Sequence, residues 1–231
     1  MTGKASATGL VGRAHPERVA DTSQSGGGLK PMGAARQILD AAARLLRHKG
    51  YEATTLRAIA LEVGIKAGSI YHHFPTKDDI IQRVVNEGVR VVHEAVTEAL
   101  AALPDDAGPR LRLETAVRAH LLSSLEHSDY TSASIRAFSF LPRNVRENCR
   151  VERRNYEEIW REIIADADRS GLLAEGVSED AVRLMLLGAV NWAGEWYRPG
   201  RLSIQKIAHD FAASVVCERE KAPGRRRSAR G

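Results

Sequence analysis

Apolar residues recur every three or four positions along most of the chain, which is the spacing of amphipathic helices. No stretch alternates apolar and polar residues as a strand would, and there is no hairpin dipeptide or internal repeat. The pattern therefore predicts an all-α fold.

Three short helices are expected first. Their apolar positions are Ile38, Ala42, Leu45 and Leu46 in the first, Leu56, Ile59, Ala60 and Val63 in the second, and Ile70 and Phe74 in the third. Gly50, Gly64 and Pro75 are expected to end these helices. Thr54 or Thr55 can cap the start of the second helix by accepting a backbone N–H.

Longer helices should follow, beginning with one that runs from Thr76 to the break at Pro104. The other expected ranges are about 111–126, 132–140, 145–169, 178–197 and 203–218. Many β-branched residues in the helix that starts at Thr76 give it weak intrinsic propensity, so it should depend on packing.

Composition narrows the class of protein. The chain has 231 residues, 43% of them hydrophobic, which is enough for a core. Two cysteines exclude a disulfide-rich scaffold. No apolar run approaches the roughly 20 residues that span a bilayer, and no secretory signal is evident. We expect a soluble, cytoplasmic protein that does not enter a membrane.

The charge is unevenly distributed. The net charge is +6 over residues 1–77, −5 over residues 78–217 and +4 over residues 218–231. This distribution favours a nucleic-acid-binding head on a body that does not touch phosphate, although a charge of +6 also fits ordinary surface variation.

Four segments are expected from these patterns. The ranges are a flexible N-terminal arm at 1–31, a three-helix head at 32–77, a larger helical body at 78–220, and a basic tail at 221–231. The arm is rich in Gly, Ser, Thr and Ala and has too little apolar surface to offset the entropy of ordering.

Residues 51–77 carry the main functional signal, because two short helices joined by a Gly-containing turn form a helix-turn-helix. Gly64 suits the turn, since a positive φ costs glycine nothing. Small residues open the third helix, which lets its end approach DNA closely. They are Ala67, Gly68 and Ser69.

The segment from Ile38 to Ile80 resembles the DNA-binding domain of the TetR family of transcriptional regulators. The matching residues are Ile38, Ala41, Ala42, Leu45, Gly50, Tyr51, Thr54, Thr55, Leu56, Ile59, Ala60, Val63, Gly64, Ile65, Gly68, Ile70, Tyr71, His73, Phe74 and Lys77. Two positions depart from the family pattern. Val63 stands where the family usually has a small residue, and Lys66 stands where it often has a capping serine.

The resemblance implies which residues contact DNA. The residues expected at backbone phosphates are Thr55, Arg57, Tyr71, His73 and Lys77. The residues expected at base edges are Lys66, Ala67, Ser69 and His72. Gly68 belongs to the same DNA-binding set, because a small residue lets the helix end approach the duplex closely. Phosphate contacts position a protein on the duplex, whereas base-edge contacts specify the sequence. Tyr71 can equally be half core, and the two adjacent histidines can be a plain surface pair. A metal site is disfavoured, since adjacent histidines on a helix diverge and no third ligand lies nearby.

The resemblance also implies a homodimer, in which the last two helices form a four-helix bundle with the partner. The first of these, about 178–197, is more apolar than one face of a monomer helix requires. Packing within one chain is the alternative interpretation.

The stretch from Asn191 to Pro199 resembles a subset of TetR-like repressors of fatty-acid or steroid breakdown that respond to acyl-CoA thioesters. The residues that this interpretation assigns to a ligand are Arg136, Phe138, Asn191, Trp192, Trp196 and Arg198. The two tryptophans can line an apolar cavity, and the arginines can meet phosphates. Alternatively, both tryptophans pack the dimer bundle.

These observations favour a transcriptional repressor that a small ligand, an acyl-CoA thioester in this interpretation, releases from a palindromic operator in double-stranded DNA. A multidrug-responsive regulator of an efflux gene is the alternative. An enzyme is disfavoured, because the sequence has no nucleophile elbow, zinc motif, phosphate-binding glycine loop or spaced carboxylate pair. We expect no cofactor, no catalytic residue and no metal.

Overall fold

The computed structural model describes residues 33–126 and 129–216. Within these ranges every regular element is a helix and there is no strand, which confirms the all-α prediction. None of the described helices is long and apolar enough to cross a membrane. The predicted N-terminal arm and basic tail lie outside the described residues.

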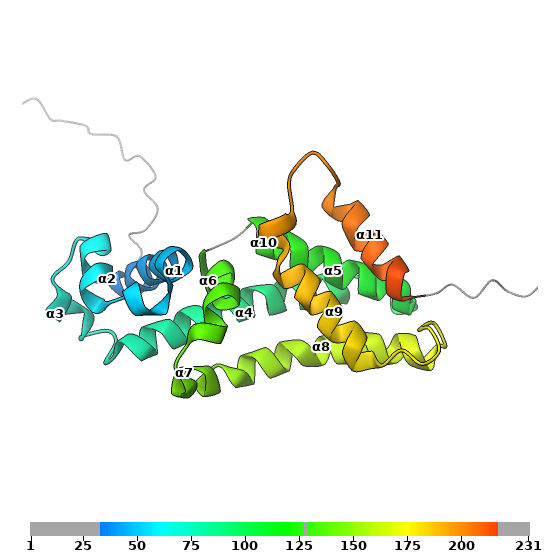
Figure 1. Ribbon diagram of the computed structural model, residues 1–231, viewed down its shortest axis with the longest axis horizontal. Coiled ribbons are helices and arrows are strands. Elements are labelled where there is room, and N and C mark those ends of the chain that lie inside the picture. Colours follow the sequence, from blue (N-terminus) through cyan, green and yellow to red (C-terminus); the bar gives the residue numbers. More distant parts are fainter. Residues whose placement is uncertain (1–32, 127–128, 217–231) are drawn as a thin grey trace, which may run out of the picture. The chain divides into compact units, whose positions relative to one another are not determined.

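The head consists of three helices packed around the start of a fourth (Figure 1). They are α1 (Ala34–Ala53), α2 (Leu56–Val63), α3 (Ala67–Ile70) and α4 (Lys77–Ala101). Ile38, Leu46, Ile59, Ile70 and Phe74 are buried in one cluster with the first turns of α4, as the apolar spacing predicted.

Two glycines shape the head. Gly50 has a φ of 76°, so regular helix ends there as predicted, but one further turn carries α1 on to Ala53. Gly64 adopts the left-handed conformation, with a φ of 78°, and ends α2.

Thr55, rather than Thr54, caps α2. The Ala58 N–H donates to Thr55 Oγ1 at 3.1 Å. Thr54 is fully buried, and its hydroxyl donates to the Gly50 carbonyl at 2.7 Å. The two alternatives that the sequence left open therefore have different roles in the structure.

α4 serves two cores in succession. It starts with a capping box, in which Thr76 and Asp79 satisfy each other's backbone N–H groups. Its N-terminal half contributes Ile80, Ile81, Val84 and Val85 to the head cluster. Its later residues, including Val92 and Val96, belong to a second apolar cluster in the body.

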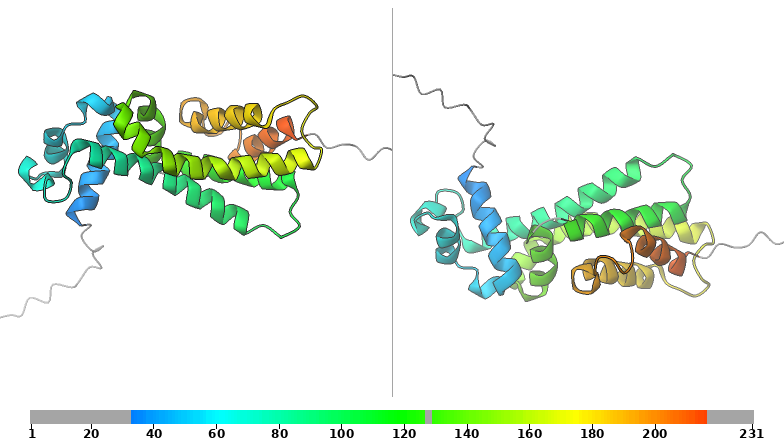
Figure 2. Two further views of the ribbon diagram at one scale, coloured as in Figure 1. Left: turned by 90° about the horizontal axis from the view of Figure 1, so that it is seen from below. Right: turned by 90° about the horizontal axis from the view of Figure 1, so that it is seen from above.

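The body contains the remaining helices. They are α5 (Pro109–Glu126), α6 (Asp129–Ala137), the 3-10 turn η1 (Phe138–Phe140), α7 (Arg143–Asn148), α8 (Arg150–Arg169), α9 (Glu179–Asn191), α10 (Ala193–Trp196) and α11 (Ile204–Val215). α4, α5 and α8 pack together, α11 lies on α5, and α6 packs against both α1 and α4 (Figure 2).

Four predicted boundaries differ from the structure. The third helix was expected to continue to Pro75, but α3 ends at Ile70, and Phe74 is buried beyond its end. The single helix expected over 145–169 is divided at Cys149 into α7 and α8. The one expected over 178–197 is interrupted at Trp192. The one expected over 132–140 begins earlier, at Asp129, and its last three residues form the tighter η1. Helical periodicity continues across such short breaks, so the sequence pattern does not reveal them.

Candidate DNA-binding and ligand-binding sites

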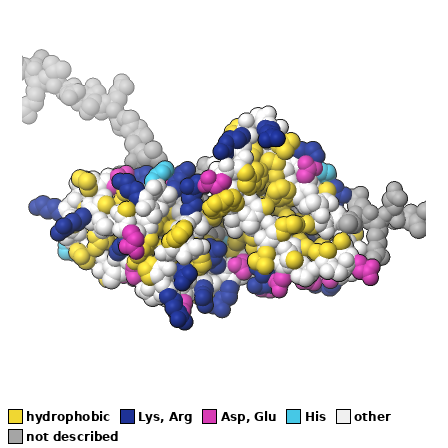
Figure 3. Space-filling view, in the orientation of Figure 1, with side chains coloured by type: hydrophobic (Ala, Val, Ile, Leu, Met, Phe, Trp, Pro, Cys, Tyr) yellow, Lys and Arg dark blue, Asp and Glu magenta, His cyan; other side chains and the backbone are white. Residues whose placement is uncertain are grey.

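The residues predicted to contact DNA gather on one exposed surface of the head. Seven of the ten are exposed, and the other three, Ala67, Ser69 and Lys77, are partly exposed. Tyr71 has 59% of its surface exposed, so it is not a core residue. Figure 3 shows Lys and Arg side chains projecting at the α2–α3 end.

The cations of this surface differ in how they are held. Arg57 and Lys66 form no ion pair with any described residue and are exposed. Lys77 is held inside the head, because its ammonium donates to the Tyr51 carbonyl at 2.6 Å and lies 3.7 Å from the centre of the Tyr51 ring. Burial lowers the pKa of Lys77. Arg57 and Lys66 are therefore the cations most available to phosphate.

The start of α3 lacks a side-chain cap. Lys66 occupies the N-cap position with extended backbone, a φ of −72° and a ψ of 139°, and its side chain accepts no hydrogen bond. This agrees with the expectation drawn from the missing serine. Ile70 still anchors α3 in the core, because it is fully buried.

A cavity opens in the body between five helices. Its volume, including the open mouth, is about 420 Å³. The lining comes from α4, α5, α6, α8 and α9, and consists of Gly88, Val89, Val92, His120, Thr131, Ser134, Ile135, Arg153, Tyr156, Glu157, Leu187 and Asn191. A mixture of apolar side chains and a few polar groups is typical of small-ligand pockets.

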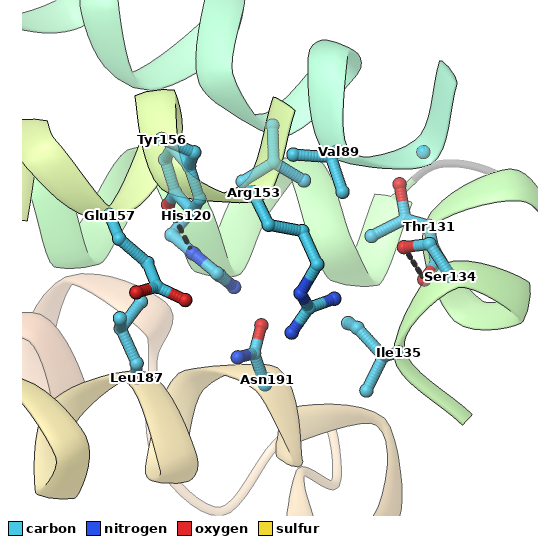
Figure 4. A pocket seen from close by; sticks show the side chains of 12 residues that line it. Val89, His120, Thr131, Ser134, Ile135, Arg153, Tyr156, Glu157, Leu187 and Asn191 are labelled. Atoms are coloured by element: carbon cyan, nitrogen blue, oxygen red, sulfur yellow. Dashed lines mark hydrogen bonds between the residues drawn. The ribbon is translucent and has the colours of Figure 1, made fainter. Parts of the chain in front are cut away.

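A histidine and a tyrosine are hydrogen-bonded in the wall of this cavity (Figure 4). His120 Nδ1 and the Tyr156 hydroxyl are 2.5 Å apart, and both rings are buried. Burial lowers the pKa of His120 to about 3, so the ring is neutral near pH 7. His120 Nε2 is buried and has no hydrogen-bond partner among the described residues.

An arginine reaches into the same cavity. Figure 4 shows Arg153 extending from α8 toward the space that His120 and Asn191 also face. The Arg153 guanidinium lies 4.0 Å from the centre of the Phe138 ring. Burial lowers its pKa, which means that its charge is held at a cost in solvation.

A second cavity adjoins the first and contains three of the predicted ligand residues. Arg136, Asn191 and Trp192 line it, and Asn191 and Ile135 line both cavities. Arg136 forms an ion pair with Glu195. Trp192 is 54% exposed, so it covers this cavity at the surface rather than filling a core.

The other three predicted ligand residues lie elsewhere. Trp196 and Arg198 line a separate hollow, where the Trp196 indole N–H donates to the Ala189 carbonyl at 3.0 Å. Phe138 packs under Arg153 and lines none of these cavities itself. The structure therefore does not bring the six residues into one site.

Sequence reasoning missed the polar residues of the central cavity. Arg153, Tyr156, Glu157 and Trp160 recur at helical spacing on α8. The available signal for a polar site was that Arg153 lies on the same face of the helix as the aromatic residues Tyr156 and Trp160. The pairing of His120 with Tyr156 had no such signal, since the two are 36 positions apart.

Large apolar side chains are exposed on α9, on α10 and in the loop before α11. They are Leu184, Met185, Trp192, Trp196 and Leu202, with exposed fractions between 39% and 63%. Figure 3 shows apolar side chains gathered over these elements. Together they form a surface that we call the α9–α11 face.

A helix-turn-helix head with an exposed third helix, joined to a helical body that encloses cavities, defines a DNA-binding transcriptional regulator. Residues 38–84 match the family described as "Bacterial regulatory proteins, tetR family", and residues 106–217 match "Tetracyclin repressor-like, C-terminal domain". The chain belongs to the TetR family, which consists of regulators rather than enzymes.

Several relatives resemble the chain over most of its length. The "HTH-type transcriptional repressor KstR2" of Rhodococcus jostii is 24% identical over 190 residues, which cover 80% of this chain and 90% of that protein. The "Fatty acid metabolism regulator protein" of Bacillus subtilis is 24% identical over 157 residues, which cover 67% of this chain and 78% of the relative.

Among solved structures, AibR "in complex with isovaleryl coenzyme A and operator DNA" is similar to this chain with a TM-score of 0.68 and 26% identity. The match covers 79% of this chain and 97% of AibR. The KstR2 structure from Mycobacterium tuberculosis has a TM-score of 0.67 at 19% identity, which supports the shared fold.

Proposed function

We propose that this regulator is a repressor that binds a palindromic operator as a homodimer and leaves it when a small ligand occupies the body. The observation that carries the DNA-binding part is the exposed surface of α2 and α3, with unpaired Arg57 and Lys66 beside His72. Its relative KstR2 is a transcriptional repressor, which supports repression rather than activation.

The α9–α11 face supports the homodimer. Exposed tryptophan, leucine and methionine side chains on neighbouring elements are typical of a protein interface. A two-fold dimer presents two heads, which must lie about 34–36 Å apart to enter successive major grooves. A ligand that binds better to a dimer with another head spacing shifts the population away from DNA.

The ligand class that the relatives favour is an acyl-CoA thioester, since AibR was solved with isovaleryl coenzyme A. We assign the acyl group to the central cavity, whose lining combines apolar side chains with a few polar ones.

Selection of bound DNA from a random pool tests the DNA-binding proposal. We expect a palindromic sequence, because a two-fold dimer reads two inverted half-sites. Recovery of an asymmetric site, or of no enriched sequence, would contradict the proposal. Addition of isovaleryl-CoA or longer acyl-CoA thioesters to the recovered complex then tests release.

Three substitutions separate specificity from affinity on the selected operator. His72→Ala should change which sequence binds best, because we assign His72 to a base edge. Arg57→Ala and Lys77→Ala should weaken specific and random DNA alike and lower the salt slope by about 1 each, because we assign both residues to phosphates. Filter binding at several salt concentrations measures both effects.

Arg57→Ala tests a phosphate contact more directly than Lys77→Ala does. Lys77 also holds Tyr51, so its removal should lower the stability of the head in addition. Thermal unfolding of each variant provides that control. Equal losses on specific and random DNA for His72→Ala would refute its assignment to a base edge.

A further inference from the structure

The interior of the central cavity presents polar groups that nothing in the described chain satisfies. His120 is 1% exposed, and its Nε2 has no hydrogen-bond partner. Figure 4 shows this ring, the Arg153 guanidinium and the Asn191 amide facing one common space. Buried polar groups without partners are costly, so their convergence indicates a partner that the ligand supplies.

Arg153 and Glu157 bring opposite charges to the lining of the cavity, but they do not form an ion pair with each other. Arg153 makes no ion pair of 4.0 Å or less with a described residue. Glu157 is instead engaged by Arg183 at 3.3 Å and by Arg161 at 3.6 Å. Glu157 favours the charge of Arg153 at a distance, and the guanidinium keeps its hydrogen-bond donors free for a ligand.

A purely apolar occupant would leave these groups unsatisfied. An alkyl chain placed beside Arg153 and His120 would exclude water from both and would accept no hydrogen bond in return. A carboxylate would neutralise the guanidinium through a charge-assisted hydrogen bond and would accept from the other donors. Arg153 also stacks on Phe138, which fixes its position and reduces the entropy lost on binding.

We propose that the central cavity recognises a carboxylate through Arg153, His120 and Asn191. The inference rests on the proposed function in one respect, that the body binds a small ligand. The carboxylate can belong to a small free acid or to the far end of a dicarboxylic acyl group on coenzyme A.

The test measures dissociation constants by calorimetry for two matched pairs. Glutaryl-CoA and valeryl-CoA have equal chain lengths and differ in a terminal carboxylate. Hexanoate and hexanamide have the same shape and differ in charge and in the replacement of one acceptor oxygen by an NH2 donor. Wild-type protein should bind the carboxylate of at least one pair about 30-fold more tightly, because removal of one partner of a buried charge pair costs at least that much.

Three variants assign the effect to the cavity. Arg153→Met should abolish the preference for the carboxylate, and Arg153→Lys should retain part of it because the charge remains. Arg154→Met is the matched control, since Arg154 is the next residue on α8 and is exposed. Its preference should equal that of wild type.

The two possible sources of the carboxylate, a free acid and an acyl thioester, give different outcomes. Preference within the hexanoate pair indicates a free acid, whereas preference confined to glutaryl-CoA indicates the acyl thioester. Equal binding within both pairs, no binding of any of the four compounds, or an unchanged preference in Arg153→Met would overturn the proposal.

Measurement of DNA release separates this proposal from the proposed function. Carboxylate binding that depends on Arg153 but leaves the operator complex intact would keep the inference and contradict ligand-driven release. Release by glutaryl-CoA and valeryl-CoA alike, with equal binding within both pairs for wild type and Arg153→Met, would keep the repressor and overturn the inference.

Discussion

The DNA-contacting surface and the ligand cavity are built in opposite ways. All ten residues assigned to DNA lie between Thr55 and Lys77, and most are exposed. The cavity takes its lining from five helices between Gly88 and Asn191, and much of it is buried. A local motif encodes the first, whereas long-range packing creates the second.

The head and the cavity are nevertheless linked where α4 and α6 cross. α4 and α6 meet at Gly88, which lines the cavity, and Tyr130 of α6 donates a hydrogen bond to Asp40 of α1 at 2.6 Å. Arg47 of α1 pairs with Asp129 at 2.8 Å. α6 therefore contacts the head on one side and the cavity on the other, through Ser134 and Ile135.

Substitution of the glycine at this crossing should have the largest effect. A Cβ at position 88 would lie 2.3 Å from the Tyr130 carbonyl oxygen and 2.9 Å from the Ser134 Cβ. Gly88→Ala must therefore force α4 and α6 apart, and we expect the free energy of unfolding to fall by about 3 kcal/mol. Urea unfolding at fixed protein concentration measures the change.

The number of unfolding transitions shows whether the head and the body unfold together. If the head and body unfold as one unit, a single transition should move to lower urea concentration. Two transitions, of which only one moves, would show that the regions are independent. Gly108→Ala is the control, because a Cβ there meets nothing within 4 Å and should change stability by at most about 0.5 kcal/mol.

Acidification should affect the cavity more than the head. The pKa of His120 is about 3 in the folded state, below its ordinary value of 6.5. As the pH falls through 6.5, the unfolded chain takes up a proton that the folded chain does not, so stability is lost between about pH 6.5 and pH 3. From pH 7 to pH 5 the loss from this group is about 2 kcal/mol.

His120→Gln should remove that part of the pH dependence, which urea unfolding at pH 7 and pH 5 measures. Tyr156 and Trp160 pack on the His120 ring, Arg153 and Glu157 line the same cavity, and all four remain in the variant. His72→Gln is the control in the head, because that side chain is exposed to water before and after unfolding. An unchanged acid response in His120→Gln would contradict the assigned burial effect.

The difference between the two regions explains what the sequence predicted. Ile70 and Phe74 were expected in the core, and Gly64 was expected at a turn, because each follows from spacing or backbone preference within a few residues. His72 and His73 are exposed, as their assignment to DNA requires, and Tyr71, for which a half-core position was the alternative, is exposed as well. Local rules suffice where the whole site is local.

The cavity could not be predicted in this way. Asn191 was identified, but Trp196 and Arg198 line a different hollow, because the helix breaks at Trp192 and turns those side chains elsewhere. The contact of His120 with Tyr156 depends on how α5 packs on α8. No periodicity in one segment reveals which side chain of another segment faces it.

The smallest predicted effect concerns the start of α3. Lys66 leaves the helix without a side-chain cap and places a cation at the positive end of the helix dipole. Lys66→Ser should therefore raise the free energy of unfolding by about 1 kcal/mol, since a serine at this position accepts a backbone N–H.

The same substitution should weaken operator binding, because it removes one of the two unpaired cations on the DNA-binding surface. A more stable head that binds DNA less tightly would show that Lys66 is retained for contact rather than for folding. Thermal unfolding and operator titration at two salt concentrations measure the two effects. Higher stability with unchanged DNA affinity would instead remove Lys66 from the DNA contacts and leave that role to Arg57 and the residues of α3.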